Sequence, residues 1–147
     1  MTGDSVPVPD GFRPAQFSPG FLDVSGPYFL KLEAGSTIIG CRMLEQHLNY
    51  AGVAHGGFLA TLADVALSLQ LYNSVEAKMP VSTFSMTINF LRAAKLGEWI
   101  EATSKIDWIG RRLGYAHGSI GSGDRLLMTM TGVYSIVRPA DDRIALA

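Results

Sequence analysis

The sequence predicts an α+β fold in which one antiparallel sheet wraps around a single long central helix. From residue 81 onward, four segments alternate apolar and polar side chains with a period of two, which is typical of half-buried strands. Residues 57–72 are instead apolar on nearly every side, the pattern of a helix that is buried all round. Turns marked by glycine separate the four segments, near residues 94–97, 110–114 and 121–124.

The chain of 147 residues, 48% of them hydrophobic, has the length and composition of one ordinary domain. Twelve Lys and Arg face thirteen Asp and Glu, and the longest basic cluster is the pair Arg111-Arg112, so no nucleic-acid partner is expected. The first ten residues lack the basic start and apolar core of a signal peptide, and no stretch is long enough to span a membrane. We therefore expect a soluble cytoplasmic protein without a membrane partner.

Cys41 is the only cysteine, which excludes an internal disulfide. No His or Cys lies near it at the spacing of zinc ligands, so no metal site is expected. Lone cysteines in strands are usually small core residues rather than nucleophiles, and we interpret Cys41 in this way.

The elements before the helix are short. Residues 1–27 hold five of the seven prolines and are predicted to form an irregular or partly helical lead-in. Strands are predicted over 28–33 and 37–44, around a turn at Ala34-Gly35-Ser36. The main domain is expected to cover residues 28–139, with a C-terminal tail over 140–147.

The four strands after the helix are predicted over 81–92, 98–109, 115–122 and 126–137, most simply paired as an antiparallel meander. In the first of them, alternation places one apolar row on a single face, together with Ser82: Phe84, Met86, Ile88 and Phe90. One small sheet cannot cover a helix that is apolar all round, so a second copy of the chain is expected to complete its burial. We expect at least a homodimer.

Asp64 is the only formal charge between Glu45 and Glu76, and it lies within the apolar helix. Burying an unpaired carboxylate is costly, so such a residue usually has partners or a catalytic task. Thr61, Asp64 and Ser68 recur at i, i+3 and i+7 and form one narrow polar stripe. A structural interpretation is that these two hydroxyls satisfy the carboxylate. We favour a catalytic task.

The segment Asn49-Tyr-Ala-Gly-Val-Ala-His55-Gly56-Gly57, followed by Asp64 in the helix, resembles hotdog-fold acyl-CoA thioesterases of the phenylacetic-acid-degradation (4-hydroxybenzoyl-CoA thioesterase-like) type. The family pattern is an Asn, then Gly-x-x-His-Gly-Gly, then an acidic residue, at this spacing. Residues 80–97 resemble the family's next strand and turn, and the likeness extends over about residues 28–137. It implies a hotdog fold that dimerises side by side, with dimers often paired into tetramers.

The resemblance implies an enzyme that hydrolyses an acyl-CoA to a free acid and coenzyme A, with no cofactor beyond the coenzyme A of the substrate. Asp64 would be the general base that activates water, or the nucleophile of a transient anhydride, and both routes stay open. The backbone N–H groups of Gly56 and Gly57 lie at the electropositive start of the helix, where they could polarise the thioester carbonyl. A glycine pair before a helix is also a common turn.

Supporting roles are implied for three further polar residues. Asn49 and His55 could hold each other and face the sulfur or the water, although a loop-fixing hydrogen bond is an equally good interpretation of His55. Ser82 could orient Asp64 or its water, whereas a serine at a strand start is often merely tolerated.

Substrate contacts are expected at two places. Arg111 and Arg112 at a hairpin tip, with Arg92 and Lys95, are candidates for the phosphates of coenzyme A, although arginines at such tips are commonly just solvated. The acyl pocket should be apolar and suit an aromatic or a medium-chain acyl group, and its candidate lining is Phe58, Leu62, Tyr72, Phe84 and Met86.

The spacing of the motif adds a constraint on assembly. Eight residues separate Gly56 from Asp64, which is about 12 Å of helix rise and too far for joint action on one carbonyl. The two groups could act together only if they came from different subunits with antiparallel central helices, giving two shared sites in each dimer.

Two other functions are compatible with the fold. A non-catalytic protein that binds acyl-CoA or a small aromatic ligand would keep the fold and lose turnover. A hotdog enoyl-CoA hydratase is less well supported, because such enzymes pair a carboxylate and a His in local patterns that are not evident in this sequence.

Overall fold

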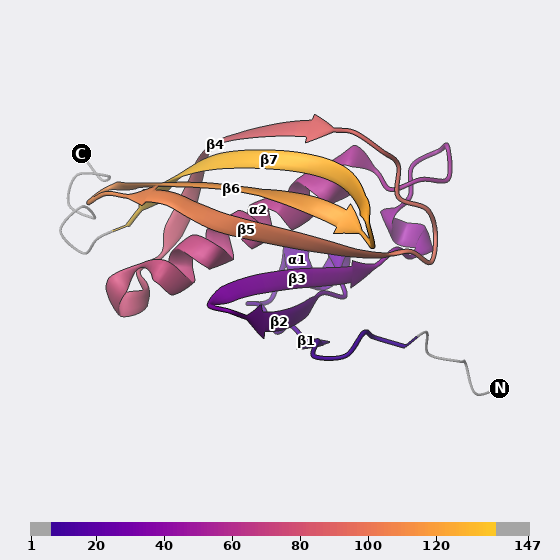
Figure 1. Ribbon diagram of the computed structural model, residues 1–147, viewed down its shortest axis with the longest axis horizontal. Coiled ribbons are helices and arrows are strands. Elements are labelled where there is room, and N and C mark those ends of the chain that lie inside the picture. The colour runs from indigo at the N-terminus through magenta and orange to yellow at the C-terminus, as the bar shows by residue number, and fades with distance from the viewer. Residues whose placement is uncertain (1–6, 138–147) are drawn as a thin grey trace.

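A computed structural model describes residues 7–137 of the chain. Seven antiparallel strands form one sheet in the order β1-β2-β3-β5-β6-β7-β4, and this sheet curls around the long helix α2 (Gly56–Ser74) (Figure 1). The predicted fold class, an antiparallel sheet wrapped around one central helix, is confirmed. The strands are β1 (Arg13–Pro14), β2 (Phe29–Glu33), β3 (Ser36–Arg42), β4 (Val81–Phe90), β5 (Trp99–Ile109), β6 (Leu113–Ser122) and β7 (Arg125–Ile136).

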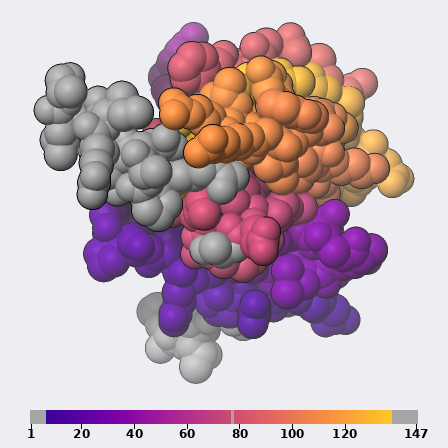
Figure 2. Space-filling model, turned by 90° about the vertical axis from the view of Figure 1, so that its left-hand side faces the viewer, coloured from indigo at the N-terminus to yellow at the C-terminus, as the bar shows by residue number. Residues whose placement is uncertain are grey.

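Helix α2 forms the centre of the hydrophobic core. It begins after His55, ends before Val75, and extends the predicted helix by a few residues. Strands β3 to β7 pack against it, so most of its side chains are buried. In Figure 2 the C-terminal end of α2, in pink, lies between the orange strands above and the indigo N-terminal segments below. The buried side chains of α2 are Phe58, Leu59, Leu62, Ala63, Val65, Ala66, Leu67, Gln70 and Leu71.

Residues 7–27 of the lead-in fold back onto this core. They contain β1, which pairs with β2, and the short helix α1 (Phe21–Ser25). Phe17 and Leu22 are partly buried against the core cluster. The short helix η1 (Glu45–His47) fastens the lead-in, because the buried His47 accepts the Leu44 N–H at Nδ1 (3.0 Å) and donates from Nε2 to the carbonyl of Ser25 (2.9 Å).

The predicted meander is wrong for β4. Strands β5, β6 and β7 are joined by hairpins, but β4 pairs with β7 at the far edge of the sheet rather than with β5. The inner edge of β5 is occupied by β3, with Ile39 opposite Ala102, so that edge offers β4 no partner. A loop over residues 91–98 therefore crosses from the end of β4 to the start of β5, and a second short helix, η2 (Glu76–Lys78), connects α2 to β4.

A bulge in β4 reverses the predicted faces of its first residues. The register with β7 shifts between Thr83 and Ser85, which inserts one extra residue into the strand. Because the side-chain period of a strand is two, Val81 and Thr83 point toward the helix, as Met86 does further along. Phe84 is 73% exposed, so the prediction that it shares a face with Met86 is wrong.

Within residues 7–137, no helix is long and apolar enough to cross a membrane, and no group of three or more His, Cys, Asp or Glu side chains could hold a metal ion. The predicted C-terminal tail, residues 140–147, lies outside the described residues.

The thiol of Cys41 is buried in β3, where it lies 3.3 Å from the carbonyl oxygen of Pro27. Burial raises the pKa of this thiol to about 12, from an ordinary value of 9.0. The unfolded chain therefore loses this proton at a lower pH than the folded chain does. The stability that depends on this group is complete below the unfolded pKa and is lost as the pH rises from 9 toward 12.

The slope of stability against pH should report this group. Above pH 9 the free energy of unfolding of the unmodified chain should fall more steeply than that of Cys41→Ala, by up to about 1.4 kcal/mol per pH unit. Urea unfolding of both proteins at several pH values between 8 and 11 measures the two slopes. Equal slopes would show that the thiol has no raised pKa in the folded protein.

Candidate active site

Asp64 lies in the middle of α2, half-buried, and one of its carboxylate oxygens is anchored by two hydroxyls. The Thr83 hydroxyl of β4 donates to Oδ1 at 2.7 Å, and the Tyr134 hydroxyl of β7 donates to the same atom at 2.9 Å. Within residues 7–137, Oδ2 has no hydrogen-bond partner. The carboxylate is thus oriented by one oxygen while the other is available for chemistry.

Tyr134 is fully buried, although its hydroxyl reaches Asp64. Burial raises the pKa of this phenol far above its ordinary value, and the adjacent charge of Asp64 adds to the effect. The phenol therefore stays protonated and stays a donor across the physiological range. Sequence inspection missed both Thr83 and Tyr134. Tyr134 is seventy residues from Asp64, and alternation had placed Thr83 on the opposite face of β4.

The structural interpretation of Asp64 named Thr61 and Ser68 as its partners, and these contacts are not formed. The hydroxyl of Thr61 donates to the carbonyl of Gly57 (2.9 Å), and that of Ser68 donates to the carbonyl of Val65 (3.3 Å). Both hydroxyls satisfy backbone acceptors of their own helix.

The start of α2 carries one open backbone donor. His55 is the N-cap residue, and its Nδ1 accepts a hydrogen bond from the Gly57 N–H at 2.8 Å. The amide of Gly57, predicted to face the substrate, is therefore already occupied. The N–H groups of Phe58 and Leu59 are satisfied by the carbonyl of His55, whereas the N–H of Gly56 has no acceptor within residues 7–137. Since Nδ1 accepts, the proton of a neutral His55 ring is on Nε2, which makes that atom a donor.

A hollow of about 360 Å³ lies beside Gly56. Gly56 is one of its lining residues, and glycine permits close approach of a ligand because it has no side chain. A Cβ at Gly56 would lie 3.4 Å from the Phe90 ring, an ordinary contact. The hollow is lined by Ala54, Gly56, Leu59, Phe90, Leu91, Arg92 and Ala93.

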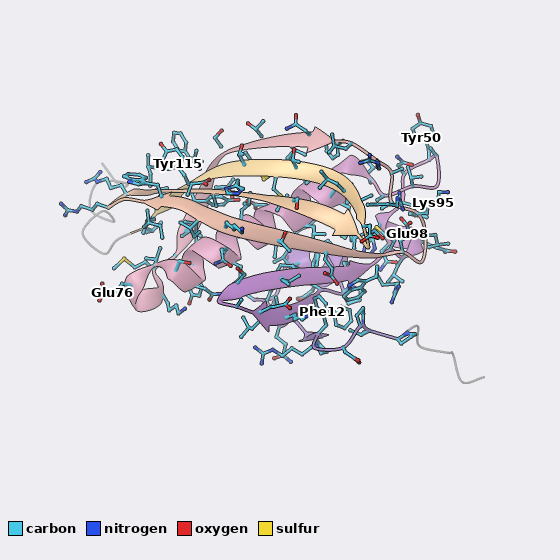
Figure 3. The ribbon with its side chains drawn as sticks, viewed as in Figure 1. Phe12, Tyr50, Glu76, Lys95, Glu98 and Tyr115 are labelled. Carbon is cyan, nitrogen blue, oxygen red and sulfur yellow. The ribbon has the colours of Figure 1, made fainter. Side chains whose placement is uncertain are left out.

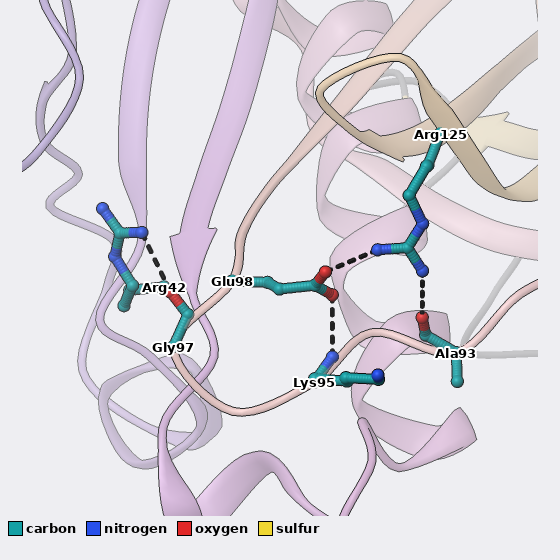
Figure 4. Close-up of polar contacts among 6 residues, drawn as sticks. All are labelled: Arg42, Ala93, Lys95, Gly97, Glu98 and Arg125. Atoms are coloured by element: carbon teal, nitrogen blue, oxygen red, sulfur yellow. Dashed lines mark hydrogen bonds and ion pairs between the residues drawn. The ribbon is translucent and has the colours of Figure 1, made fainter.

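The loop that borders this hollow is held by a set of polar contacts (Figure 4). Glu98 accepts from the backbone N–H of Lys95 (2.8 Å) and pairs with Arg125, and Arg125 also donates to the carbonyl of Ala93 (2.8 Å). Arg42 donates to the carbonyl of Gly97 at 3.0 Å. The backbone N–H of Ala54 donates to the carbonyl of Ala94 (2.8 Å), which ties this loop to the segment before the helix.

Asn49 shapes the loop before α2 rather than contacting His55. Its side-chain oxygen accepts from the backbone N–H groups of Ala51 (2.9 Å) and Val53 (3.3 Å). This is the local turn that Asn side chains commonly form. Within the described part of the chain, the predicted hydrogen bond between Asn49 and His55 is not formed.

Ser82 does not lie where the sequence predicted. The bulge that turns Thr83 toward the helix turns Ser82 away from it, and Ser82 is exposed opposite Ser135 of β7. Thr83 makes the contact to Asp64 that alternation had assigned to Ser82.

The predicted acyl pocket is not assembled as expected. Leu62 is fully buried in the core, and Phe58 is buried with its ring stacked on His47 at 4.1 Å between centroids. Phe84 is exposed, and Met86 is partly buried against the core. Tyr72 does line a hollow of about 280 Å³, together with Val65, the residue after Asp64. The prediction failed because most of the apolar side chains of α2 are buried in the hydrophobic core and do not line a pocket.

The four candidate cations lie at opposite ends of the molecule. Arg111 and Arg112 occupy the tip between β5 and β6, where the carbonyl of Arg112 accepts from the Ile136 N–H (2.7 Å). Arg92 and Lys95 lie on the loop beside the start of α2. Figure 3 shows Lys95 and Glu98 at one end of the molecule and Glu76, which follows α2, at the other.

The same separation holds for the two catalytic candidates. Gly56 and Asp64 lie eight residues apart on a continuous helix, a rise of about 12 Å, so one copy of the chain does not bring them to a common carbonyl.

Comparison with known proteins places this architecture in a family. Residues 51–129 match the family model described as the thioesterase superfamily. The chain is 36% identical over 130 residues to a Pseudomonas aeruginosa protein named putative esterase PA0474, covering 88% of this chain and 97% of that protein. It is 36% identical to acyl-coenzyme A thioesterase 13 of Mus musculus over 67% of this chain and 70% of that one.

Solved structures agree. A thioesterase superfamily member 2 from zebra fish superposes with a TM-score of 0.75 at 28% identity, covering 82% of this chain and 88% of that one. A mutant of the phenylacetic acid degradation protein PaaI of Thermus thermophilus gives 0.70 at 25% identity, covering 79% and 97%. A hypothetical thioesterase of Streptococcus pneumoniae solved with coenzyme A gives 0.69 at 25% identity, covering 75% and 88%. The chain therefore belongs to the thioesterase superfamily and is a thioester hydrolase with the hotdog fold.

Proposed function

We propose that this protein hydrolyses acyl-CoA thioesters with Asp64 as its catalytic carboxylate. The observation that carries the proposal is the geometry of this side chain, with Oδ1 held by two hydroxyls and Oδ2 open. The acyl-coenzyme A thioesterase of Mus musculus and the coenzyme A complex described above support acyl-CoA as the substrate class.

The chemistry requires an electrophile, a nucleophile and a leaving group. An amide N–H at the start of a helix stabilises the negative charge that develops on the carbonyl oxygen, and the N–H of Gly56 is the open donor there. Acting as a base, Asp64 Oδ2 accepts the proton of a water whose oxygen attacks the carbonyl carbon. The C–S bond then breaks, and the thiolate of coenzyme A leaves and takes a proton. Attack by Oδ2 itself, followed by hydrolysis of the anhydride, gives the same products.

Dimerisation through β4 would complete this site. Strand β4 is ten residues long, forms an edge of the sheet and carries exposed apolar side chains, with Phe84 73% and Phe90 57% exposed. A long apolar edge is a template for pairing with another chain. Thr83, near one end of β4, contacts Asp64, while Phe90 at the other end lies against Gly56.

Antiparallel pairing of two β4 strands would therefore place the Asp64 end of one protomer beside the Gly56 end of its partner. It would also bring Arg111 and Arg112 of one protomer toward the partner's Arg92 and Lys95, which lie at opposite ends of a single copy. Four cations around one site would suit the phosphates of coenzyme A. The tetramer implied by the resemblance, the cytoplasmic location and the lack of any further cofactor stay predictions.

The first test is Asp64→Asn, which keeps the size of the side chain and removes the base or nucleophile. Release of free thiol from a panel of acyl-CoAs should fall by about 1,000-fold or more, while the variant keeps its oligomeric state and melting behaviour. A fully active Asp64→Asn would remove the proposed mechanism. Tight binding of acyl-CoA by a wild-type protein that releases no thiol would favour the non-catalytic binding function.

The donor role of Gly56 can be tested with a matched pair. Gly56 is the first residue of α2, where proline is tolerated, and His55 before it has ψ 134°, which suits a residue preceding proline. Gly56→Pro removes the N–H and should lower kcat about 100-fold or more, the usual effect of losing one such donor. Gly56→Ala keeps the N–H and should stay within about tenfold of wild type. Similar losses of kcat in both variants would indicate that the added side chain crowds the site, rather than that the N–H is needed.

Mixing subunits tests whether the site is shared. Asp64→Ala and Gly56→Pro dimers should each be nearly inactive, whereas a mixed dimer has both defects in one site and leaves the other site intact. Random assortment makes half of the dimers mixed, each with one of two sites intact, so about a quarter of wild-type activity should return. Absence of any recovery, with mixed dimers shown by mass spectrometry, would count against shared sites.

The contribution of the Thr83 hydroxyl, one of the two that hold Asp64, can be separated from that of the neighbouring Ser82. Thr83→Val removes a hydrogen bond to a charged group, a loss of about 1.5–3 kcal/mol, and should lower kcat at least tenfold with little change in KM. Ser82→Ala, one residue earlier and turned away, should lower kcat less than threefold. A larger loss of kcat in Ser82→Ala than in Thr83→Val would show that Ser82 orients Asp64, as the sequence predicted.

A further inference from the structure

A trough runs along α2 from Val65, the residue after Asp64, toward the C-terminal end of the helix. Its floor is Val65, Ser68, Leu69 and Tyr72, which recur at i, i+3, i+4 and i+7 and therefore form one stripe along two helical turns. Phe17 and Leu22 of the lead-in form one wall, and Pro80 and Val81 before and at the start of β4 form the other. The volume is about 280 Å³.

The trough lies next to the catalytic carboxylate, although Asp64 is not among its lining residues. Val65 directly follows Asp64, and Ser68 lies one helical turn beyond it. On the opposite wall, Val81 precedes by two residues the Thr83 whose hydroxyl holds Asp64 Oδ1. A carbonyl carbon attacked at Asp64 would thus have its acyl substituent near the end of the trough that Val65 and Val81 line.

The lining is chemically suited to a hydrocarbon. Six of the eight lining side chains are apolar, the other two are hydroxyl-bearing Ser68 and Tyr72, and none is charged. A second hollow, of about 350 Å³ near the start of α2, combines Gln46, His47 and His55 with apolar side chains such as Phe21 and Leu48, so its lining is also largely apolar. Burial of apolar surface favours an acyl chain in hollows of this kind, and position distinguishes the trough, because its stripe lies next to Asp64 on α2.

The wall formed by the lead-in is fixed in place. His47 donates to the Ser25 carbonyl, the Tyr28 hydroxyl donates to the Ser25 hydroxyl at 2.8 Å, and the Ala15 N–H donates to the Tyr28 carbonyl at 2.9 Å. These bonds hold α1 against the domain from both of its flanks. A wall held in this way can discriminate among ligands by shape, because it does not simply move aside.

We propose that this trough binds the acyl chain of the substrate, that the N-terminal lead-in is its selectivity wall, and that it favours unbranched chains of about eight to ten carbons. The inference rests on the proposed acyl-CoA hydrolysis. From Val65 to Tyr72 the helix rises about 10 Å. An extended chain advances about 1.2 Å per bond, as in an extended backbone, so about eight bonds fill the stripe. A two-turn stripe is longer than a single aromatic ring.

The test compares kcat/KM for butanoyl-, hexanoyl-, octanoyl-, decanoyl-, dodecanoyl- and phenylacetyl-CoA. With wild type, kcat/KM should rise about fourfold for each added methylene, the usual value for a buried methylene, and level off at eight to ten carbons. Leu22→Trp narrows the trough and should end the rise three or four carbons earlier, a loss of at least about 30-fold for decanoyl relative to butanoyl. The inhibition constant of free coenzyme A should stay within about twofold, because the trough does not hold it.

Leu32→Trp is the matched control, since Leu32 is 68% exposed on β2 and lines none of the hollows described above. It should leave the length profile unchanged. Leu22→Ala widens the trough and should raise kcat/KM for phenylacetyl-CoA relative to that for decanoyl-CoA. Should Leu22→Trp fail to fold, Tyr72→Trp narrows the far end instead and should shorten the preferred chain.

The outcomes separate the two proposals. A wild type inactive with every chain length would remove the proposed function. Activity that does not depend on chain length, or equal chain-length profiles of kcat/KM for Leu22→Trp and Leu32→Trp, would overturn only the proposal that the trough binds the acyl chain. Weaker inhibition by coenzyme A in Leu22→Trp, in step with the loss of turnover, would show that the trough holds the pantetheine arm and would also overturn the inference.

Discussion

Helix α2 is apolar on nearly all sides, and the remaining elements are arranged so that its surface is covered. Burying one large apolar side chain contributes about 1.5–3 kcal/mol, so exposing a few of them would cancel a typical net stability of about 5–15 kcal/mol. The curled sheet covers one side of the helix, and the lead-in with Phe17 and Leu22 covers part of another. The side that stays least covered is the stripe with Asp64, next to the exposed edge strand β4.

The position of Asp64 on this boundary explains its properties. The side chain lies far enough inside the protein for its Oδ1 to accept from hydroxyls of β4 and β7, the two strands at that edge of the sheet. Near enough to the uncovered side, its Oδ2 has no hydrogen-bond partner among residues 7–137. The straightness of the same helix keeps the open amide of Gly56 two turns away, and for this reason the proposed mechanism uses the donor of a second copy.

In the proposed acyl site, the lead-in serves both the stability of the core and the selection of the substrate. His47 is buried, its ring stacks on Phe58, and its two nitrogens join the loop before α2 to the end of α1. One histidine outside the recognised motif thus holds the segment that covers α2 and walls the trough. Apolar cover over a core helix becomes a binding surface where it leaves a gap beside a reactive group.

The sequence by itself determined the elements whose signals are local. The apolar run marked α2, period-two alternation marked β5 to β7, and the isolated charge drew attention to Asp64, because composition and periodicity act within one segment. The motif before the helix led to the family. Only the tertiary structure decided that β4 pairs with β7, that a bulge turns Thr83 rather than Ser82 inward, and that Tyr134 reaches Asp64. These depend on contacts between distant segments, and one inserted residue reverses the faces of a strand without altering its composition.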